Sequence, residues 1–301
     1  MKRRFVPMAA CGIGMLLLIL DSRQAGASAR DAIDLCIKSV IPSVFPFFLL
    51  SGFLTGGGVL FTGLFGGYPA GAQAAAQLAA GGYMDNTRAS RLLTWCSQAG
   101  PSFIFGIAAA QFPDFCYGWY LWGVQILSAL SVRMIFPEGN TVKNQYQKRA
   151  DSSLAMHRAL HAMGAVCGWV VIFRVILGFL ERWFFFLLPD IAKVLLSGIL
   201  ELTNGCLMLP QIENIGLRFL LCLIFLNFGG VCVILQTISV AHELNIRYYL
   251  TGKLLQCGLA VLYGCLFLGY GYALFPLVGY FIGILFFRGR KNSSIPGLVG
   301  V

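Results

Sequence analysis

The feature that most limits how this chain can fold is a run of 46 residues, 39–84, that contains no Asp, Glu, Lys or Arg. A membrane-crossing helix needs about 20 mostly apolar residues, so this run can hold two crossings, or one crossing and a re-entrant hairpin. Other charge-free runs cover residues 5–20, 92–113, 115–132, 219–241 and 254–287, and residues 159–180 and 183–209 carry few charges. We therefore expect an all-α, polytopic integral membrane protein with about eight transmembrane helices.

The composition supports the same class. Hydrophobic residues make up 58% of the chain and charged residues only 11%, against roughly 25% in soluble domains. The net charge of +10 does not indicate a nucleic-acid partner, because the basic residues gather at the ends of the apolar runs. The positive-inside rule then places the N-terminus, the 137–158 connection and the C-terminus on the cytoplasmic side of a cell membrane. Residues 1–29 are compatible with either a cleaved signal peptide or an uncleaved first helix.

Two halves of the sequence echo each other. The stretch FGGYPAGAQ (65–73) shares Phe, Gly, Gly and Gln with FGGVCVILQ (228–236) at the same four positions. The tetrapeptide LLSG precedes each of them, and Asn-X-Arg followed by Gln98 or Gln256 comes after each. This order predicts two inverted repeats: residues 1–136, including the N-terminal helix, a polar cytoplasmic linker at 137–158, and a second membrane repeat at 159–301.

Both Phe-Gly-Gly motifs predict broken or re-entrant helices. Because hydrocarbon offers no water to free backbone groups, such breaks must be buried in protein or line a cavity. A broken helix presents amide N–H groups and a positive dipole end that suit an anion, and glutamines can orient a solute. Pure helix packing is the alternative for the glycines. The substrate-binding candidates are Gly67, Tyr68, Gln73, Gln98, Gly230 and Gln236.

Glu201, in GILELTNG, is the candidate for ion coupling, because an ionisable side chain at membrane depth usually has a function. The alternative is a carboxylate at a helix end, since Asn204 and Gly205 follow closely. Lys253 directly precedes the longest C-terminal apolar run, where we expect its side chain to snorkel to the headgroups.

Catalysis, metals and cofactors are not expected. His157 and His161 have a metal-compatible spacing but no third ligand nearby, and the ten cysteines are scattered without a CxxC pair. Thr251-Gly252-Lys253 lacks the glycine spacing of a phosphate-binding loop, and no nucleophile arrangement stands out. We expect neither catalytic residues nor a metal site, and no cofactor, so the chain is not expected to be an enzyme.

Several motifs resemble a known family. GGYPAGAQ, SRLLTWCSQAGPSFIFG (90–106), LLSGILELTNG (195–205) and FGGVCVILQ resemble the YlbJ-type sporulation integral membrane proteins, within the wider nucleoside recognition or Gate-domain group. The resemblance implies a transporter-like membrane protein of spore-forming bacteria that moves dipicolinate toward the forespore. The family usually has Lys where Gln73 stands and His where Ile234 stands, so the chain would be a divergent member.

The leading hypothesis is a multi-pass transporter or permease of the sporulation Gate family that moves a small organic solute, by resemblance a dipicolinate-like anion. The alternative is a non-transporting structural or assembly factor of the sporulation membrane. The lipid bilayer and a small-molecule solute are the expected partners. A homo-oligomer or contacts with other sporulation membrane proteins remain open.

Overall fold

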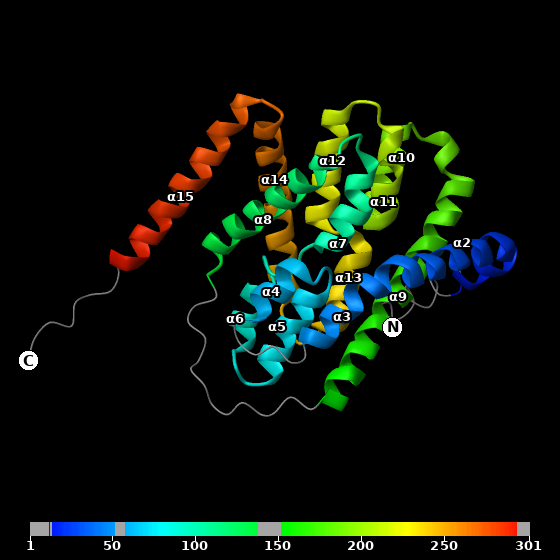
Figure 1. The fold of residues 1–301 in the computed structure, drawn as a ribbon, viewed down its shortest axis with the longest axis horizontal. Helices are drawn as coiled ribbons and strands as arrows, with labels where there is room; N and C mark the ends of the chain where they lie inside the picture. The colour runs from blue at the N-terminus through cyan, green and yellow to red at the C-terminus, as the bar shows by residue number, and fades with distance from the viewer. Residues whose placement is uncertain (1–11, 13, 52–57, 138–151, 294–301) are drawn as a thin grey trace, which may run out of the picture.

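The computed structural model describes residues 12, 14–51, 58–137 and 152–293, and the described residues form helices and connecting turns with no strand (Figure 1). The helices of the first half are α2 (Ser22–Leu35), η1 (Cys36–Val40), α3 (Ile41–Ser51), α4 (Gly58–Phe65), α5 (Ala70–Ala80), α6 (Asn86–Leu92), α7 (Pro101–Phe103), η2 (Ile104–Ala108), η3 (Ala109–Gln111) and α8 (Cys116–Ile135). Those of the second half are α9 (Ser152–Trp183), η4 (Phe185–Leu187), α10 (Asp190–Leu200), α11 (Leu202–Met208), η5 (Leu209–Gln211), α12 (Ile215–Phe228), α13 (Gly230–Val240), α14 (Ile246–Phe267), η6 (Gly271–Ala273) and α15 (Leu274–Ser293).

The all-α membrane architecture is confirmed, but few helices are long enough to cross a bilayer without interruption. Among the described residues, three spans meet the length and hydropathy requirements: Ala155–Trp183, Ile215–Val240 and Ile246–Phe267. A pair of helices bent by 57°, Ser22–Val40 and Val44–Leu50, adds a fourth if it is one span. The expected eight crossings are not all continuous helices, because glycines, prolines and unwound turns divide several of the apolar runs into short segments.

Large apolar side chains cover the outside of the molecule, as expected for a surface that faces lipid tails. Aromatic and aliphatic residues on α8, α9, α14 and α15 and around η4 are among the most exposed, including Trp119, Ile172, Phe186, Leu254, Phe275 and Ile282. In a water-soluble protein such residues would be buried. Their exposure on helices from both halves supports the membrane assignment.

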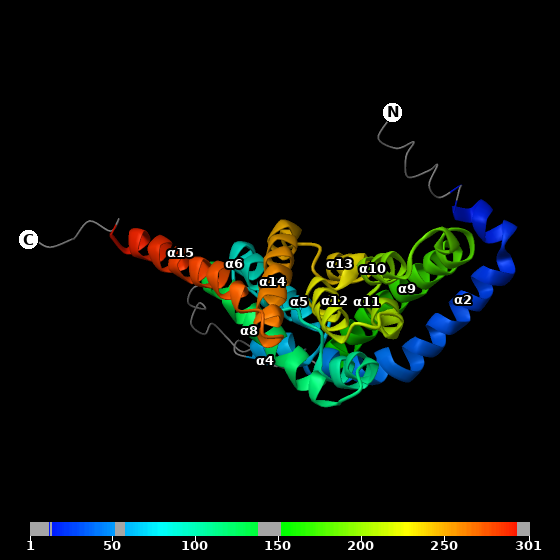
Figure 2. The same cartoon turned by 90° about the horizontal axis from the view of Figure 1, so that it is seen from above.

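The two halves of the sequence pack into one body. Helix α9 of the second half lies along α2 and α3 of the first, and α14 packs against α8 (Figures 1 and 2). At the outer edge Arg182 of α9 pairs with Asp21 just before α2, at 2.9 Å. Helix α15 projects from one end of the bundle and α2 lies at the other (Figure 2).

The predicted linker overlaps a helix. Residues 138–151 lie outside the described part of the chain, but α9 begins at Ser152, within the 137–158 segment that the sequence marks as polar. Ala155 and Ala159, one turn apart on the buried face of α9, show why: the helix already packs against its neighbours there.

Both Phe-Gly-Gly motifs interrupt a helix. Gly67 separates α4 from α5 with φ +78°, and Gly229 and Gly230 separate α12 from α13 with φ +81° and +80°. These left-handed values cost residues with a Cβ about 1–2 kcal/mol, which explains why glycine stands at each break. The breaks set the positions of the side chains described below.

A third interruption lies in the first half at residues 93–100, here called the unwound segment, between α6 and α7. Glycines allow it to pass through the core: a Cβ added to Gly63 or Gly71 would overlap the carbonyl oxygen of Cys96, and one added to Gly252 would overlap that of Thr94. At these three positions glycine permits close packing of backbone on backbone.

Candidate functional site

A cavity of about 430 Å³, here called the main cavity, opens between the two halves. Its walls come from helix interruptions: the turn before α5 supplies Gly67 and Tyr68, the end of the unwound segment supplies Ala99 and Gly100, and the α10–α11 break supplies Glu201 and its neighbours. Irregular backbone in a membrane protein is tolerated when it lines such a space.

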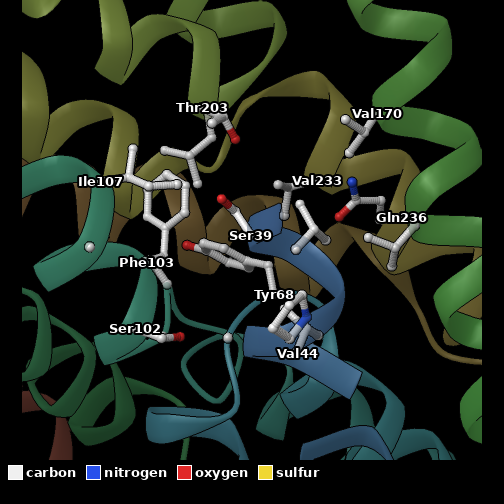
Figure 3. Close-up of a pocket in the computed structure, with 18 of the residues that line it drawn as sticks. Ser39, Val44, Tyr68, Ser102, Phe103, Ile107, Val170, Thr203, Val233 and Gln236 are labelled. Atoms are coloured by element: carbon white, nitrogen blue, oxygen red, sulfur yellow. The ribbon is translucent and has the colours of Figure 1, made fainter. Parts of the chain in front are cut away.

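The remaining lining is mostly apolar with a few polar groups. Figure 3 shows Phe103 and Ile107 on one side of the main cavity and Val233 and Gln236 on the other, with Tyr68 between them. Hydroxyl groups are supplied by Ser39, Ser102 and Thr203 (Figure 3). A pocket of this type, apolar with a small number of polar groups, is typical of small-molecule sites.

Behind Tyr68 lies a buried side chain that the sequence led us to expect at the membrane surface. Lys253, on α14, is only 1% exposed. Its ammonium group donates to the Tyr68 hydroxyl at 3.0 Å, to Gln256 Oε1 at 3.1 Å and to the carbonyl of Ser97. The Tyr68 hydroxyl in turn donates to the carbonyl of Leu226 at 2.9 Å. The expectation that Lys253 snorkels to the headgroups is therefore wrong.

Amide side chains continue this arrangement into the second half. Gln98 Nε2 donates to Gln256 Oε1 at 3.0 Å, and Gln256 Nε2 donates back to Gln98 Oε1 at 2.6 Å. Gln256 Nε2 also reaches Asn227 Oδ1 at 2.8 Å, which accepts a further bond from Ser128 at 3.1 Å. We call this group the polar network; its members are Tyr68, Gln98, Ser128, Asn227, Lys253 and Gln256.

Two members of the network, Gln98 and Lys253, and the neighbouring Gln125 hold the unwound segment in place. The carbonyl of Ser97 accepts from Lys253, that of Trp95 accepts from the Gln98 amide at 2.6 Å, and that of Ala99 accepts from Gln125 Nε2 at 2.9 Å. Buried carbonyls without partners would cost several kcal/mol each in hydrocarbon. The side chains thus replace the backbone bonds that a helix would have made.

Glu201 is 3% exposed and caps α11. Its Oε1 accepts from the amide of Thr203 at 3.0 Å, and its Oε2 accepts from the backbone and side-chain amides of Asn204 at 2.8 and 2.7 Å. The carboxylate is therefore a helix-end cap, as one alternative held, and it also lines the main cavity. Its role in ion coupling stays a prediction.

The sequence candidates fall into four groups in space. Gly67, Tyr68, Gln236 and Glu201 line the main cavity. Gln98 lies in the polar network, behind that wall. Gly230 is not part of the cavity lining: a Cβ there would lie 3.2–3.3 Å from the carbonyl oxygens of Gly198, Ile199 and Leu200, so it serves close packing.

Gln73 is separate from the main cavity. It lines a second cavity of about 340 Å³ beside α5, and its buried Oε1 has no hydrogen-bond partner among the described residues. The two glutamines that end the matching motifs, Gln73 and Gln236, therefore lie in different cavities.

Several polar residues in and beside the network carried a weak signal in the sequence. Asn227 directly precedes the second Phe-Gly-Gly motif, and Gln125 and Ser128 interrupt a charge-free run. Polar residues at such positions are costly in a membrane and point to a partner. Lys253 gave no such signal, because a lysine at the start of an apolar run usually lies at a helix end.

Few charges surround the main cavity. Lys38 is on its rim and pairs with Asp34 at 3.2 Å in an exposed ion pair. Among the described residues no carboxylate lies within 4 Å of Lys253, whose ammonium also lies 4.8 Å from the centroid of the Tyr68 ring. When protonated, Lys253 is a buried positive charge with no counter-ion in the described part of the chain. No metal-binding group of three or more ligands occurs among the described residues.

Comparison with known proteins finds a similar membrane protein. The chain is 24% identical to the sporulation integral membrane protein YlbJ of Bacillus subtilis over an alignment 311 positions long. The alignment covers 79% of this chain and 76% of that protein. The chain is a distant relative of that protein. No family model matches the chain, and no solved structure matches it.

Proposed function

We propose that this chain is a membrane permease that binds a small organic solute in the main cavity and carries it across the bilayer. The observation that carries the proposal is the convergence of helix interruptions from both halves on one cavity. In secondary transporters broken helices from matching halves surround the substrate. The volume of about 430 Å³ lies within the range of roughly 300–1,000 Å³ found for small-molecule sites.

Contact between sequence-equivalent residues supports two related repeats. Gln98 and Gln256 stand at matching places in the two halves, and they hydrogen-bond to each other. Two equivalent residues touch when they lie beside the axis that relates the repeats. We infer that the polar network marks this axis, and that the main cavity lies next to it.

An anionic solute is the best fit to the charges. Lys253 reaches the Tyr68 hydroxyl, and Tyr68 forms the cavity wall, so the protonated ammonium group lies one side chain away from a bound solute. Charges in a low-dielectric interior are weakly screened, and no described carboxylate neutralises this one. Glu201, with its oxygens held by amide groups, is our candidate for taking up a coupled cation.

The biological setting follows from the distant relative. Since that relative is a sporulation integral membrane protein, we infer that this chain also acts in a sporulation membrane. Dipicolinate, the aromatic dicarboxylate implied by the family resemblance, is the first solute to test. Tyr68 and Phe103 offer the aromatic surfaces against which such a ring would pack.

The test is uptake of radiolabelled dipicolinate and of a neutral nucleoside into proteoliposomes. We expect dipicolinate uptake above that of protein-free liposomes, and its loss in Lys253→Gln, which removes the charge. Lys193→Gln is the matched control: it removes a cation that pairs with Asp190 away from the cavity lining, and it should leave uptake nearly unchanged.

Two results would count against the proposal in different ways. Nucleoside uptake that is insensitive to Lys253→Gln contradicts the anion assignment. Failure to transport either solute, with a folded protein, contradicts the permease and favours the structural or assembly factor.

A further inference from the structure

The second cavity lies along the same three elements as the main cavity. On α9 the main cavity is lined by Val166 and Val170, and the second cavity by His161, Ala162 and Ala165. On and after α13 the main cavity is lined by Val233 and Gln236, and the second cavity by residues 239–243. The third element is α5 with its preceding turn: Gly67 and Tyr68 line the main cavity, and Gln73, Ala76, Gln77 and Ala80 line the second.

The two cavities are separated by at most about one helical turn. On α9 the lining passes from Val166 of the main cavity to Ala165 and Ala162 of the second, and on α13 it passes from Gln236 to Ser239 and Val240. These steps of one to four residues correspond to at most about 6 Å along a helix. Two cavities that follow each other along the same three elements indicate two chambers in line rather than two unrelated pockets.

Small apolar residues lie where the linings of the two cavities meet. Ala70, Ala162 and Val166 belong to one buried cluster, and Val240 packs against it. We call these four residues the barrier. Their side chains are small, so a modest rearrangement of α5, α9 or α13 would join the two chambers.

The second cavity also has the character of a solute path. Gln73 faces it with a buried Oε1 that has no hydrogen-bond partner among the described residues, and an unpaired buried amide oxygen is costly unless a ligand or water meets it. Exposed His161, His242 and Glu243 lie on its lining, so this chamber reaches the surface. On α9 the second cavity lies nearer the N-terminal end of the helix than the main cavity does. That end follows the 137–158 connection, which the sequence predicts to be cytoplasmic.

We propose that the second cavity is the cytoplasmic vestibule of the path that begins in the main cavity, and that the barrier is the gate between them. Gln73 and Gln236, the matching ends of the two Phe-Gly-Gly motifs, then offer one amide to the solute on each side of the gate. The inference rests on the proposed permease function and extends it, because it assigns a second site for the same class of small organic solute.

The experiment is side-specific labelling in sealed vesicles with a membrane-impermeant methanethiosulfonate. Ala165→Cys places a thiol in the second cavity, and Ser102→Cys places one in the main cavity. Mass spectrometry of the peptides that carry them separates their labelling from that of the native cysteines. We expect Ala165→Cys to react only from the cytoplasmic face and Ser102→Cys only from the opposite face.

A second pair of variants tests the gate. Val166→Ala with Val240→Ala should let the reagent pass, so that Ser102→Cys also reacts from the cytoplasmic face. Ile172→Ala with Ile238→Ala is the matched control on outward faces of the same helices, where the side chains are 49% and 38% exposed. In that control background, Ser102→Cys should still react only from the face opposite the cytoplasm.

Reaction of both thiols from the same face would overturn the inference. It would also be overturned if the barrier variants and the control variants gave the same labelling of Ser102→Cys from the cytoplasmic face. The labelling needs no solute, so it fails independently of the uptake assay. If the protein takes up solute but both thiols react from the same face, only the vestibule proposal is contradicted. If the thiols react from opposite faces but no solute is taken up, only the proposed permease is contradicted.

Discussion

The two Phe-Gly-Gly breaks begin with the same residues and perform different tasks. After the first break, Tyr68 crosses to the second half, where its hydroxyl donates to Leu226 and accepts from Lys253. At the second break the equivalent residue is Val231, which has no polar group to offer. There Gly230 packs against the carbonyl end of α10 instead, and Gln236 donates within its own helix to Cys232 Sγ at 3.3 Å.

This difference shows that the left-handed glycine determines where the helix stops, and the residues around it determine what the break does. The first break joins the halves through polar contacts beside the main cavity. The second break is a tightly packed contact between α13 and α10, here called the packed seam, and it supports the side of the main cavity formed by Val233 and Gln236.

The largest effect is expected at the packed seam. Gly230→Ala and Gly67→Ala both place a Cβ at positive φ, at a cost of about 1–2 kcal/mol each. The new Cβ at 230 would also lie 3.2–3.3 Å from three carbonyl oxygens, whereas the nearest atom at 67 is 3.5 Å away. Thermal unfolding in detergent should show a clearly larger loss for Gly230→Ala. An equal or larger loss for Gly67→Ala would remove the distinction.

The next effect tests the polar role of the first break. Tyr68→Phe deletes one oxygen, and both Lys253 and the Leu226 carbonyl lose a buried partner, which should cost about 1–3 kcal/mol. Val231→Ala removes two methyl groups from a half-buried side chain and should cost about 1 kcal/mol. If the valine variant unfolded at the lower temperature, the polar connection would not be the important feature of this break.

The smallest effect concerns the glutamine pairs. A double-mutant cycle between Gln98→Ala and Gln256→Ala should give a coupling free energy of about 1 kcal/mol, because the two amides bond directly. The cycle between Gln73→Ala and Gln236→Ala should give a smaller value, since these glutamines line different cavities. The reverse order, measured from unfolding midpoints, would argue against the network as the contact between the halves.

The sequence predicted the helical membrane class and the location of both breaks, because the density of charge and the pairing of glycines are local properties. Of the seven residues that it placed along one solute path, Gly67, Tyr68, Gln236 and Glu201 line the same cavity, and their roles there stay predictions. It did not distinguish Gln73 from Gln236. Which cavity a glutamine faces depends on how α5 and α13 are rotated in the bundle, and packing sets that rotation.

Lys253 was missed for a related reason. A lysine before an apolar run has an inexpensive position at the membrane surface, and only the tertiary arrangement shows that the unwound segment brings a carbonyl to it. The sequence did not show which of the expected crossings are continuous helices, because charge-free runs do not reveal where a helix breaks. At residues 93–100 the break is stabilised by Gln125 and Lys253, which are distant in sequence.

The most direct test of a solute site in the main cavity is a thermal-shift measurement with dipicolinate on purified protein in detergent. Gly106→Phe adds a ring to the cavity lining at a position where a new Cβ meets no atom within 4 Å, and Gly123→Phe makes the same change at an exposed position of α8. A ligand at 100 times its dissociation constant stabilises the folded state by about 2.7 kcal/mol. We predict that dipicolinate raises the unfolding temperature of the parent protein and of Gly123→Phe, and has no effect on Gly106→Phe. An equal shift in Gly106→Phe, or no shift in the parent protein, would contradict the account.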